Sequence, residues 1–238
     1  MNATIDIGNT RTKWALWDGS EMVCSGITPD NPKEALLSQG FDAIICTTGN
    51  GAMPQWVERA RSVHTLCTEC TLPVAIDYDT PETLGADRIA AACGAWSKSG
   101  GRACVVVDAG TCITLDFVDE QGIYHGGAIM PGIDMKFRSL HTFTAKLPLL
   151  EDVRGGENLT TGRTTRQSMV AGVLKATQLA IEGFVAYYRG MSVGVEVWLT
   201  GGDVERLCEA GLDKLERIHI EPQLVMAGMN EILKLNKE

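Results

Sequence analysis

Apolar positions in this chain fall into short runs and into longer periodic stretches. Short apolar runs that end in small polar residues or glycine predict buried strands, and they occur at residues 3–10, 43–49, 105–112 and 195–203. Helices are predicted between them, at residues 54–61, 88–96, 165–189 and 222–235. Strands and helices that follow one another in this way predict an α/β fold.

Two of the predicted helices carry a recognisable start signal. The longest, residues 165–189, has an apolar stripe at the three-and-four spacing of an amphipathic helix. Thr164 and Gln167 fit the T-x-x-Q capping box at its beginning. Asp87 is expected to open the helix at residues 88–96, because aspartate is a preferred N-cap residue.

The two halves of the chain repeat the same order of elements. A strand ends in Asp-x-Gly at Asp6 and again at Asp108, which is 108 − 6 = 102 residues later. A second extended segment, a further turn and a third strand candidate follow in each half, and a later apolar strand ends in glycine. We interpret the repeat as two similar α/β domains facing each other across a cleft, and chance recurrence of a common turn is the alternative. The domains would be residues 1–104 and 105–238.

Composition and charge narrow the possible partners. The 238 residues are 45% apolar and 21% charged, which suits a globular core and excludes a disordered chain. A net charge of −9 disfavours nucleic acid or an anionic membrane as the main partner. No secretory signal and no apolar run of about 18 residues is visible. We therefore expect a soluble cytoplasmic protein that binds neither nucleic acid nor membrane.

Eight cysteines are scattered along the chain without a framework spacing, which predicts reduced thiols. Cys67 and Cys70 form the one local pair, and His64 precedes them by three residues. A structural zinc site needs four ligands, and no second pair follows. Ordinary thiols are therefore the favoured interpretation of this pair.

The first Asp-x-Gly turn carries groups that suit a nucleotide phosphate and its metal. Gly8 permits close backbone approach to a ligand, and Lys13 offers a mobile ammonium group for a phosphate. Asp6 could hold a hydrated Mg²⁺ through water. The stretch is not a Walker A loop, and a polar hairpin facing solvent is the alternative. Further polar groups in the turn come from Asn9, Thr10 and Thr12.

The second turn and a segment between the two turns add the other candidate groups. Asp108 and Thr111 would face the first turn if the repeat reflects structural duplication, and such a cleft suits a nucleoside triphosphate with its metal. Asp87 could accept a hydroxyl proton, while Arg88 could bind an anionic group of the acceptor. The alternative for these two residues is a helix cap and an ordinary first-turn arginine.

Five motifs in one order resemble those of the type III pantothenate kinases, also called the Bvg accessory factor family. They are Asp6-x-Gly-Asn-Thr with Lys13, residues 85–88 (Gly-Ala-Asp-Arg), Asp108-x-Gly-Thr, residues 126–132 and residues 200–203. The resemblance runs from residue 4 to about residue 205. This family belongs to the superfamily of acetate and sugar kinases, Hsc70 and actin. The resemblance therefore implies two tandem ribonuclease H-like domains with an interdomain cleft.

The resemblance also implies an activity, which is ATP-dependent phosphorylation of pantothenate to 4'-phosphopantothenate, the first step of coenzyme A biosynthesis. Asp87 resembles the family's proton acceptor, and Asp108 resembles its ligand for an activating monovalent cation, K⁺ or NH₄⁺. The implied ATP and Mg²⁺ contacts are Asp6, Ile7, Gly8, Asn9, Thr10, Arg11, Thr12, Lys13 and Thr111. The implied pantothenate contacts are Tyr78, Gly85, Ala86, Asp87, Arg88 and Thr165. Members of the family are homodimers whose long helix helps to form the acceptor site.

One departure from the family pattern and two competing functions remain. Cys112 follows Gly110 and Thr111 where the family usually has alanine, a change expected to matter little unless the thiol faces the cleft and is oxidised. One competing function is a kinase of the same superfamily that acts on a sugar or acetate. The other is a non-catalytic nucleotide-binding regulator.

Overall fold

The computed structural model describes residues 1–8, 11–157 and 159–237, and it divides into two compact units. The first unit comprises residues 1–101, 121–125 and 223–238, and the second comprises residues 102–120 and 126–222. The chain therefore passes from one unit to the other near the sequence-based boundary at residue 104 and later returns to the first unit. The assignment of whole domains to residues 1–104 and 105–238 remains a proposal.

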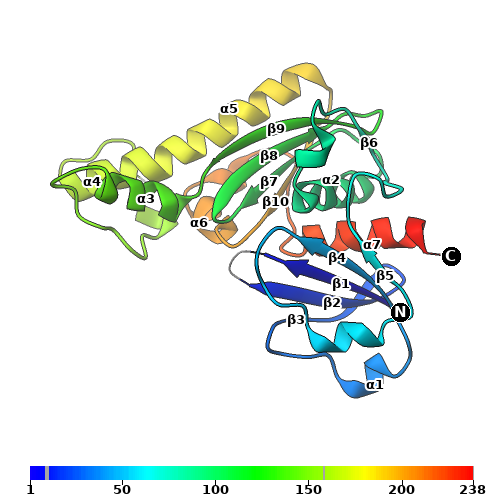
Figure 1. Ribbon diagram of the computed structural model, residues 1–238. Coiled ribbons are helices and arrows are strands. Elements are labelled where there is room, and N and C mark those ends of the chain that lie inside the picture. The colour runs from blue at the N-terminus through cyan, green and yellow to red at the C-terminus, as the bar shows by residue number, and fades with distance from the viewer. Residues whose placement is uncertain (9–10, 158, 238) are drawn as a thin grey trace. The chain divides into compact units, whose positions relative to one another are not determined.

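The first unit is built on a five-stranded sheet in the order β3-β2-β1-β4-β5 (Figure 1). Its strands are β1 (Asn2–Ile7), β2 (Thr12–Asp18), β3 (Glu21–Ile27), β4 (Asp42–Thr47) and β5 (Val63–Thr65). β2 is antiparallel to β1 and β3, whereas β4 is parallel to β1 and β5. The central strand β1 is buried at almost every position because both of its faces are covered. One face contributes to a core that includes Ile5, Trp14 and Phe41.

Helices cover the first unit's sheet and also pack tightly against each other. They are α1 (Glu34–Leu37), the 3₁₀ turns η1 (Gln55–Arg59) and η2 (Pro81–Thr83), α2 (Ala86–Lys98) and α7 (Leu224–Asn236). α7 contacts β1, β4 and α2. A Cβ atom at Gly228 would lie 1.8 Å from the carbonyl oxygen of Ala90, and one at Gly94 would lie 2.7 Å from that of Leu224. Glycine at both positions lets α2 and α7 approach closely, which fixes α2 against the sheet.

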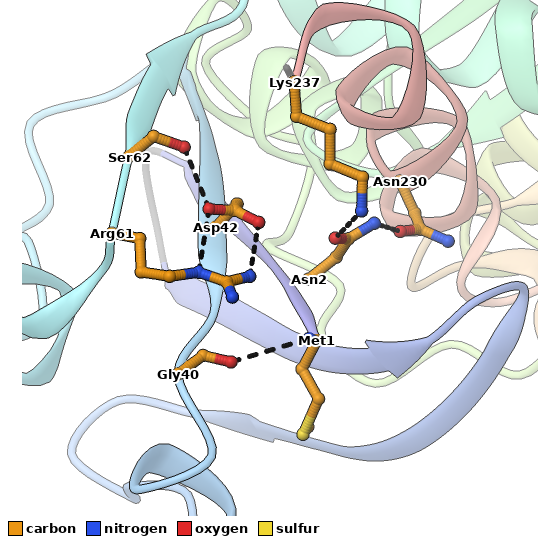
Figure 2. A network of polar contacts seen from close by, with 8 residues as sticks. All are labelled: Met1, Asn2, Gly40, Asp42, Arg61, Ser62, Asn230 and Lys237. Atoms are coloured by element: carbon orange, nitrogen blue, oxygen red, sulfur yellow. Dashed lines mark hydrogen bonds and ion pairs between the residues drawn. The ribbon is translucent and has the colours of Figure 1, made fainter.

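Polar contacts hold the C-terminal helix to the start of β1 (Figure 2). Asn2 donates a hydrogen bond of 2.7 Å to the side chain of Asn230 and accepts one of 2.9 Å from Lys237. On the neighbouring strand, Arg61 pairs with Asp42 at 2.6 Å. Both ends of the chain are therefore anchored in the same unit.

The second unit repeats the strand order of the first. Its strands are β7 (Cys104–Ala109), β8 (Cys112–Val118), β9 (Ile123–Pro131), β10 (Glu196–Thr200) and β11 (Ile218–Ile220), in the order β11-β10-β7-β8-β9. β7 is antiparallel to β8 and parallel to β10, as β1 is to β2 and β4. The repeat predicted from the sequence is thereby confirmed. The first residues of β9 belong to the first unit, where they pair with β6 (Ala75–Ile76).

The two Asp-x-Gly turns differ in length by one residue. Asp6 pairs with Lys13 across the first turn, whereas Asp108 pairs with Thr114 across the second. The first turn spans residues 8–11 between the paired Ile7 and Thr12, and the second spans residues 110–112. Asp6 and Asp108 therefore hold the same place in their sheets.

Helices of the second unit pack on its sheet around a long apolar segment. They are α3 (Ile133–Thr142), η3 (Gly155–Glu157), α4 (Thr165–Val170), the π turn η4 (Ala171–Lys175), α5 (Ala176–Met191), α6 (Val204–Glu209) and η5 (Leu212–Lys214). α4, η4 and α5 run on as one helical segment, as the periodicity predicted. Its inner face joins the core, where the ring of Tyr188 stacks on Phe117 at 4.8 Å.

The predicted capping box is present at the start of that segment. Thr164 accepts a hydrogen bond of 3.2 Å from the backbone N–H of Gln167. The Gln167 side chain returns a bond to the N–H of Arg163, one residue earlier than in the ideal motif. The segment Thr165–Met191 is also long and apolar enough to cross a membrane by length and composition, but its inner face packs in the core of the unit.

Candidate active site

The first unit gathers charged groups where β1 and β4 end. These strands are parallel, so their carboxyl ends meet at one edge of the sheet, and Asp6 lies opposite Cys46 there. Lys13 lies opposite Asp6 on the other neighbouring strand. Side chains of directly opposed residues project on the same face of a sheet. A carboxylate and an ammonium group therefore share one face at this edge.

The environment of Asp6 brings Asp87 into the same group. Burial raises the pKa of Asp6 to about 6, Lys13 opposes this rise, and the carboxylate of Asp87 adds to it. A hydrogen bond with the Cys46 thiol also lowers this pKa. Burial raises the pKa of Cys46, so that group stays a neutral thiol. Asp87 is thus close enough to Asp6 for their charges to interact, although 81 residues separate them in the sequence (87 − 6).

The turn after Asp6 is held by its own backbone and by a neighbouring loop. The N–H of Gly8 donates to the carbonyl oxygen of Arg11 at 3.1 Å, and that of Thr48 donates to Ile7 at 3.0 Å. Thr12 is buried, and its hydroxyl donates to Ala52 at 3.4 Å. Thr12 is therefore a structural part of the turn. Arg11 and Lys13 are exposed, and the predicted contacts Asn9 and Thr10 lie outside the described residues.

Asp87 lies in the first turn of α2 but does not open the helix. The helix begins at Ala86 after Gly85, which has extended backbone angles, and no side chain caps it. The prediction that Asp87 is the N-cap is therefore wrong. Its Oδ1 atom instead accepts a bond of 2.9 Å from the N–H of Arg88. A Cβ atom at position 85 would lie 2.6 Å from this oxygen, so Gly85 leaves room for the carboxylate.

Other predicted acceptor residues lie together on the same helix and in the segment before it. Arg88 is buried, with 8% of its surface exposed, and its guanidinium carbon lies 6.0 Å from the centre of the Tyr78 ring. The Tyr78 ring in turn lies 6.3 Å from that of Tyr124. A buried arginine over an aromatic ring is a fixed positive group. The first unit therefore places Tyr78, Arg88 and Asp87 close together, and their role as acceptor contacts stays a prediction.

Asp108 occupies the matching strand end in the second unit. Its partner strand continues into Gly201, which has φ +99°. A Cβ atom at Gly201 would lie 2.5 Å from Oδ1 of Asp108 and 2.3 Å from the carbonyl oxygen of Ala109. Only glycine fits both the backbone angle and the space, so Gly201 leaves room for the Asp108 carboxylate.

Two loops form backbone hydrogen bonds with the turn that carries Thr111. The N–H of Gly132 donates to the carbonyl oxygen of Thr111 at 3.0 Å, and the N–H of Asp203 donates to that of Ala109 at 2.9 Å. The motif at residues 126–132 runs along the second part of β9 to Gly132, and the motif at residues 200–203 runs from the end of β10 to Asp203. The structure shows that both support the turn after Asp108.

Sequence reasoning missed the residue that joins these two loops. Arg206, in α6, forms ion pairs with Asp134 at 2.8 Å and Asp203 at 3.0 Å. Asp134 lies in the first turn of α3, directly after the Gly132 loop, and Asp203 follows the Gly201 loop. The spacing of Asp203 and Arg206 was the available signal, but i,i+3 pairs are common on exposed helices. The partner Asp134 could not be read from the sequence.

Thr165 lies apart from the Asp108 turn within the second unit. It is exposed at the start of α4 and lines a pocket of about 740 Å³ with Leu140, Leu147 and residues 162–164. Neither Asp108 nor Thr111 lines this pocket. The second unit therefore does not bring Thr165 together with the other predicted site residues.

The described residues contain no cluster of three or more His, Cys, Asp or Glu side chains that could hold a metal ion. A divalent cation near Asp6 would therefore take most of its ligands from water and from the phosphates of a nucleotide. This arrangement suits Mg²⁺, which keeps several waters and uses one or two protein carboxylates. Asp6 supplies such a carboxylate, so the donor group at this strand end fits the ion.

Solved structures support the duplicated fold. The chain aligns over 98% of its length with a conserved putative Baf family transcriptional activator from Campylobacter jejuni, at 20% identity and a TM-score of 0.61, covering 97% of that chain. It also aligns over 98% of both chains with a putative 2-dehydro-3-deoxygalactonokinase from Sinorhizobium meliloti, at 12% identity and a TM-score of 0.54. Together with the repeated strand order, these likenesses confirm the predicted α/β fold of two ribonuclease H-like units.

Comparison of the sequence with those of known proteins assigns the chain to one family. The sequence profile of the type III pantothenate kinase family matches residues 3–187. The type III pantothenate kinase of Cytophaga hutchinsonii is 34% identical over 247 aligned positions, covering 99% of this chain and 100% of that protein. The chain belongs to the type III pantothenate kinase family. It is a phosphotransferase that uses ATP and a divalent metal.

Proposed function

We propose that this chain transfers the γ-phosphoryl group of ATP to the primary hydroxyl of pantothenate, forming 4'-phosphopantothenate for coenzyme A biosynthesis in the cytoplasm. The observation that carries the proposal is the group formed by Asp6, Lys13 and Asp87 in the first unit. Phosphoryl transfer depends on positioning and on neutralisation of charge, with one group to orient or deprotonate the nucleophile. These three residues provide a metal ligand, a phosphate-binding cation and a base.

The donor phosphates would bind at the turn after β1. Lys13 is exposed beside Asp6, so its ammonium group can reach a phosphate oxygen. Gly8 allows the chain to turn at the strand end, where a ligand can approach the backbone. We infer that Ile7, Asn9, Thr10, Arg11 and Thr12 complete this ATP-binding segment. Thr12 would act there through the hydrogen bond that it donates to Ala52 in the neighbouring loop.

Asp6 would hold Mg²⁺, in part through water. The raised pKa of Asp6 fits this role, because the negative charge of Asp87 and burial both disfavour its ionised form until a cation is present. When bound, the ion would neutralise charge on the phosphates. Pairing of β1 with β2 and β4 keeps Asp6 at the strand end, opposite Lys13.

Asp87 would accept the proton of the pantothenate hydroxyl as that oxygen attacks phosphorus in line with the leaving oxygen of ADP. Its Oδ1 atom accepts a hydrogen bond from the N–H of Arg88, which orients the carboxylate. Arg88 and Tyr78 lie together near the same end of α2 and would bind the carboxylate and polar chain of pantothenate. Gly85 and Ala86 would line this acceptor site.

The second unit would add its own contacts for the donor, at the strand end that matches that of Asp6. We infer that Asp108 binds the activating monovalent cation, K⁺ or NH₄⁺, and that Thr111 contacts ATP. Oxygen ligands suit such ions, and Gly201 keeps the space beside the Asp108 carboxylate. The support comes from the repeat, because Asp108 ends β7 as Asp6 ends β1.

We also infer a homodimer in which Thr165 of the partner chain contributes to the acceptor site. The outer face of α5 supports this inference, because apolar and small residues recur on it at helical spacing and stay exposed. On α5 this outer face consists of Ala176, Leu179, Gly183 and Tyr187, and Gly172 in η4 continues it. Leu179 and Tyr187 are 57% and 65% exposed. A continuous uncharged face on a core helix is typical of an interface.

The proposed substrate is tested by ADP release from the purified chain with Mg²⁺, K⁺ and ATP. We expect release with pantothenate and none above background with a panel of sugars or with acetate. Release with a sugar in place of pantothenate would show a different kinase of the same superfamily. Nucleotide binding without release for any acceptor would show a regulator instead.

A further inference from the structure

Two thiols lie side by side in the turn that follows β5. The Sγ atoms of Cys67 and Cys70 are 3.7 Å apart. Cys67 is exposed and Cys70 is half-buried, so a small molecule in solvent can reach the first sulfur. The sheet order separates this turn from Asp6 by β4, and neither thiol belongs to the proposed kinase site.

The folded chain holds this turn on both sides. Before the turn, the N–H of Leu66 donates to the carbonyl oxygen of Ile45 at 2.8 Å. After it, the backbone N–H and carbonyl of Thr71 form bonds of 2.9 and 2.8 Å with the side chain of Asn236 in α7. Within the turn, the N–H of Cys70 donates to the carbonyl oxygen of Cys67 at 3.3 Å. The closeness of the thiols is therefore a property of the fold and not only of their spacing.

We propose that Cys67 and Cys70 form a reversible disulfide by exchange with a low-molecular-weight disulfide of the oxidised glutathione type. The sulfur atoms must approach to a bond length of about 2 Å, which side-chain rotation within an anchored turn can achieve. In a reducing compartment the pair stays as two thiols, and oxidation closes it.

The exchange occurs in two balanced steps. The Cys67 thiolate attacks one sulfur of the oxidised molecule, which breaks the S–S bond, forms a mixed disulfide and releases one small thiolate. Cys70 then loses its proton and attacks the Cys67 sulfur, which releases the second small thiolate. The two protons from the cysteines end on the two small thiols. The protein pair is oxidised by two electrons, and the small disulfide is reduced by two.

The surroundings assign these roles to the two cysteines. Cys70 donates its S–H to the carbonyl oxygen of Thr65 at 3.5 Å, and burial raises its thiol pKa. It therefore ionises less readily than an exposed thiol and suits the second step. A metal site is not favoured, because in the described part of the chain no third ligand completes a cluster with this pair.

The test treats the reduced, full-length protein with oxidised glutathione and follows it by intact-mass and peptide analysis. We expect the wild type to lose the mass of two hydrogens at this pair and to carry no glutathione on it. Dithiothreitol should restore the starting mass. Cys67→Ser and Cys70→Ser should each instead gain one stable glutathionyl group on the remaining thiol. Cys112, exposed in the same protein, provides an internal control for a lone thiol, which can only gain an adduct.

A second measurement separates the fold from simple closeness in sequence. The equilibrium between the dithiol and the disulfide is compared in native protein and in protein unfolded by concentrated urea. We expect the native state to favour the disulfide by about tenfold, because the anchored turn raises the effective concentration of one thiol at the other. A stable glutathionyl group on wild-type Cys67, disulfides between chains, or an equilibrium no more favourable than in urea would overturn the proposal.

Discussion

The pKa of Asp6 is set by neighbouring groups that act in opposite directions. Its folded-state pKa of about 6 lies above its ordinary value of 3.8, because burial and Asp87 outweigh Lys13 and the Cys46 thiol. Between these two pH values the folded state binds more protons than the unfolded state. Stability therefore falls as pH rises through this range, and the cost is fully present above pH 6. The buried Asp6 carboxylate therefore lowers the free energy of unfolding, but it provides a ligand for a cation.

The first prediction concerns Asp6→Asn in protein free of nucleotide and metal. We expect the variant to be more stable than wild type at pH 8 by up to about 3 kcal/mol, since the cost of the buried charge is removed. The difference should shrink to nothing near pH 4. Urea unfolding at several pH values measures it, with Asp18→Asn as the exposed control. A variant less stable than wild type at pH 8 would show that the Asp6 carboxylate stabilises the empty site.

Asp87 shows why residue preferences alone could not place the candidate site. Aspartate is favoured at helix N-caps, so the sequence predicted that role. In the structure Gly85 precedes the helix and Asp87 lies in its first turn, where its carboxylate acts on Asp6. That interaction depends on the packing of α2 beside the sheet. No local pattern reports such a long-range contact.

At the scale of elements, the Asp134–Arg206–Asp203 contacts join α3 and α6 around the turn after Asp108. Both loops that they hold are bonded directly to that turn, through Gly132 and Asp203. Burial raises the pKa of Asp203, and the Arg206 guanidinium opposes this rise. Loss of the arginine would leave the half-buried Asp203 without its cation and would release the two loops.

The second prediction is that Arg206→Gln lowers kcat/KM for ATP by about ten- to a hundredfold, because small displacements of a positioning loop are costly. The KM for pantothenate should change little, and Arg206→Lys should recover part of the loss. Steady-state kinetics with each substrate varied measures both effects. Arg59→Gln, which breaks an exposed pair with Glu34, is the matched control and should behave as wild type. An equal loss of kcat/KM for ATP and for pantothenate would instead indicate a general loss of structure.

The strands and the long helix could be predicted because their signals are local. Each apolar run with an Asp-x-Gly ending became a buried strand, and the Thr164 capping box marks the start of α4. The segment at residues 54–61 formed only the short 3₁₀ turn Gln55–Arg59. The contacts of glycines 132 and 201 could not be predicted, since they join loops that are far apart in sequence.

For the whole molecule, the repeat in sequence predicted the repeat in strand order, because both units bury the same succession of apolar runs. The final helix was predicted at residues 222–235, and α7 occupies Leu224–Asn236. Its place in the first unit could not be inferred from periodicity. An apolar stripe shows that a helix has a face to bury, but not which sheet it covers.

The third prediction tests the inferred homodimer. We expect wild type to have about twice the 25.7 kDa chain mass in solution, and Leu179→Lys to be a monomer, because a charge on the outer face of α5 would be buried at the interface. Light scattering after size exclusion measures the mass. Leu235→Lys, at a leucine of α7 that is 51% exposed, should remain a dimer. A monomeric wild type that still phosphorylates pantothenate would exclude a role for the partner's Thr165.

The central claim is that Asp87 acts as the base beside Asp6 and Lys13, and turnover of Asp87→Asn tests it most directly. General bases contribute about 10²–10⁴-fold in rate, so the folded variant should lose at least about a hundredfold in kcat. ADP release with saturating ATP and pantothenate measures this loss, with circular dichroism to check folding. Asp18→Asn, at the far end of β2, should retain wild-type turnover. A folded Asp87→Asn variant with kcat near that of wild type would contradict the account.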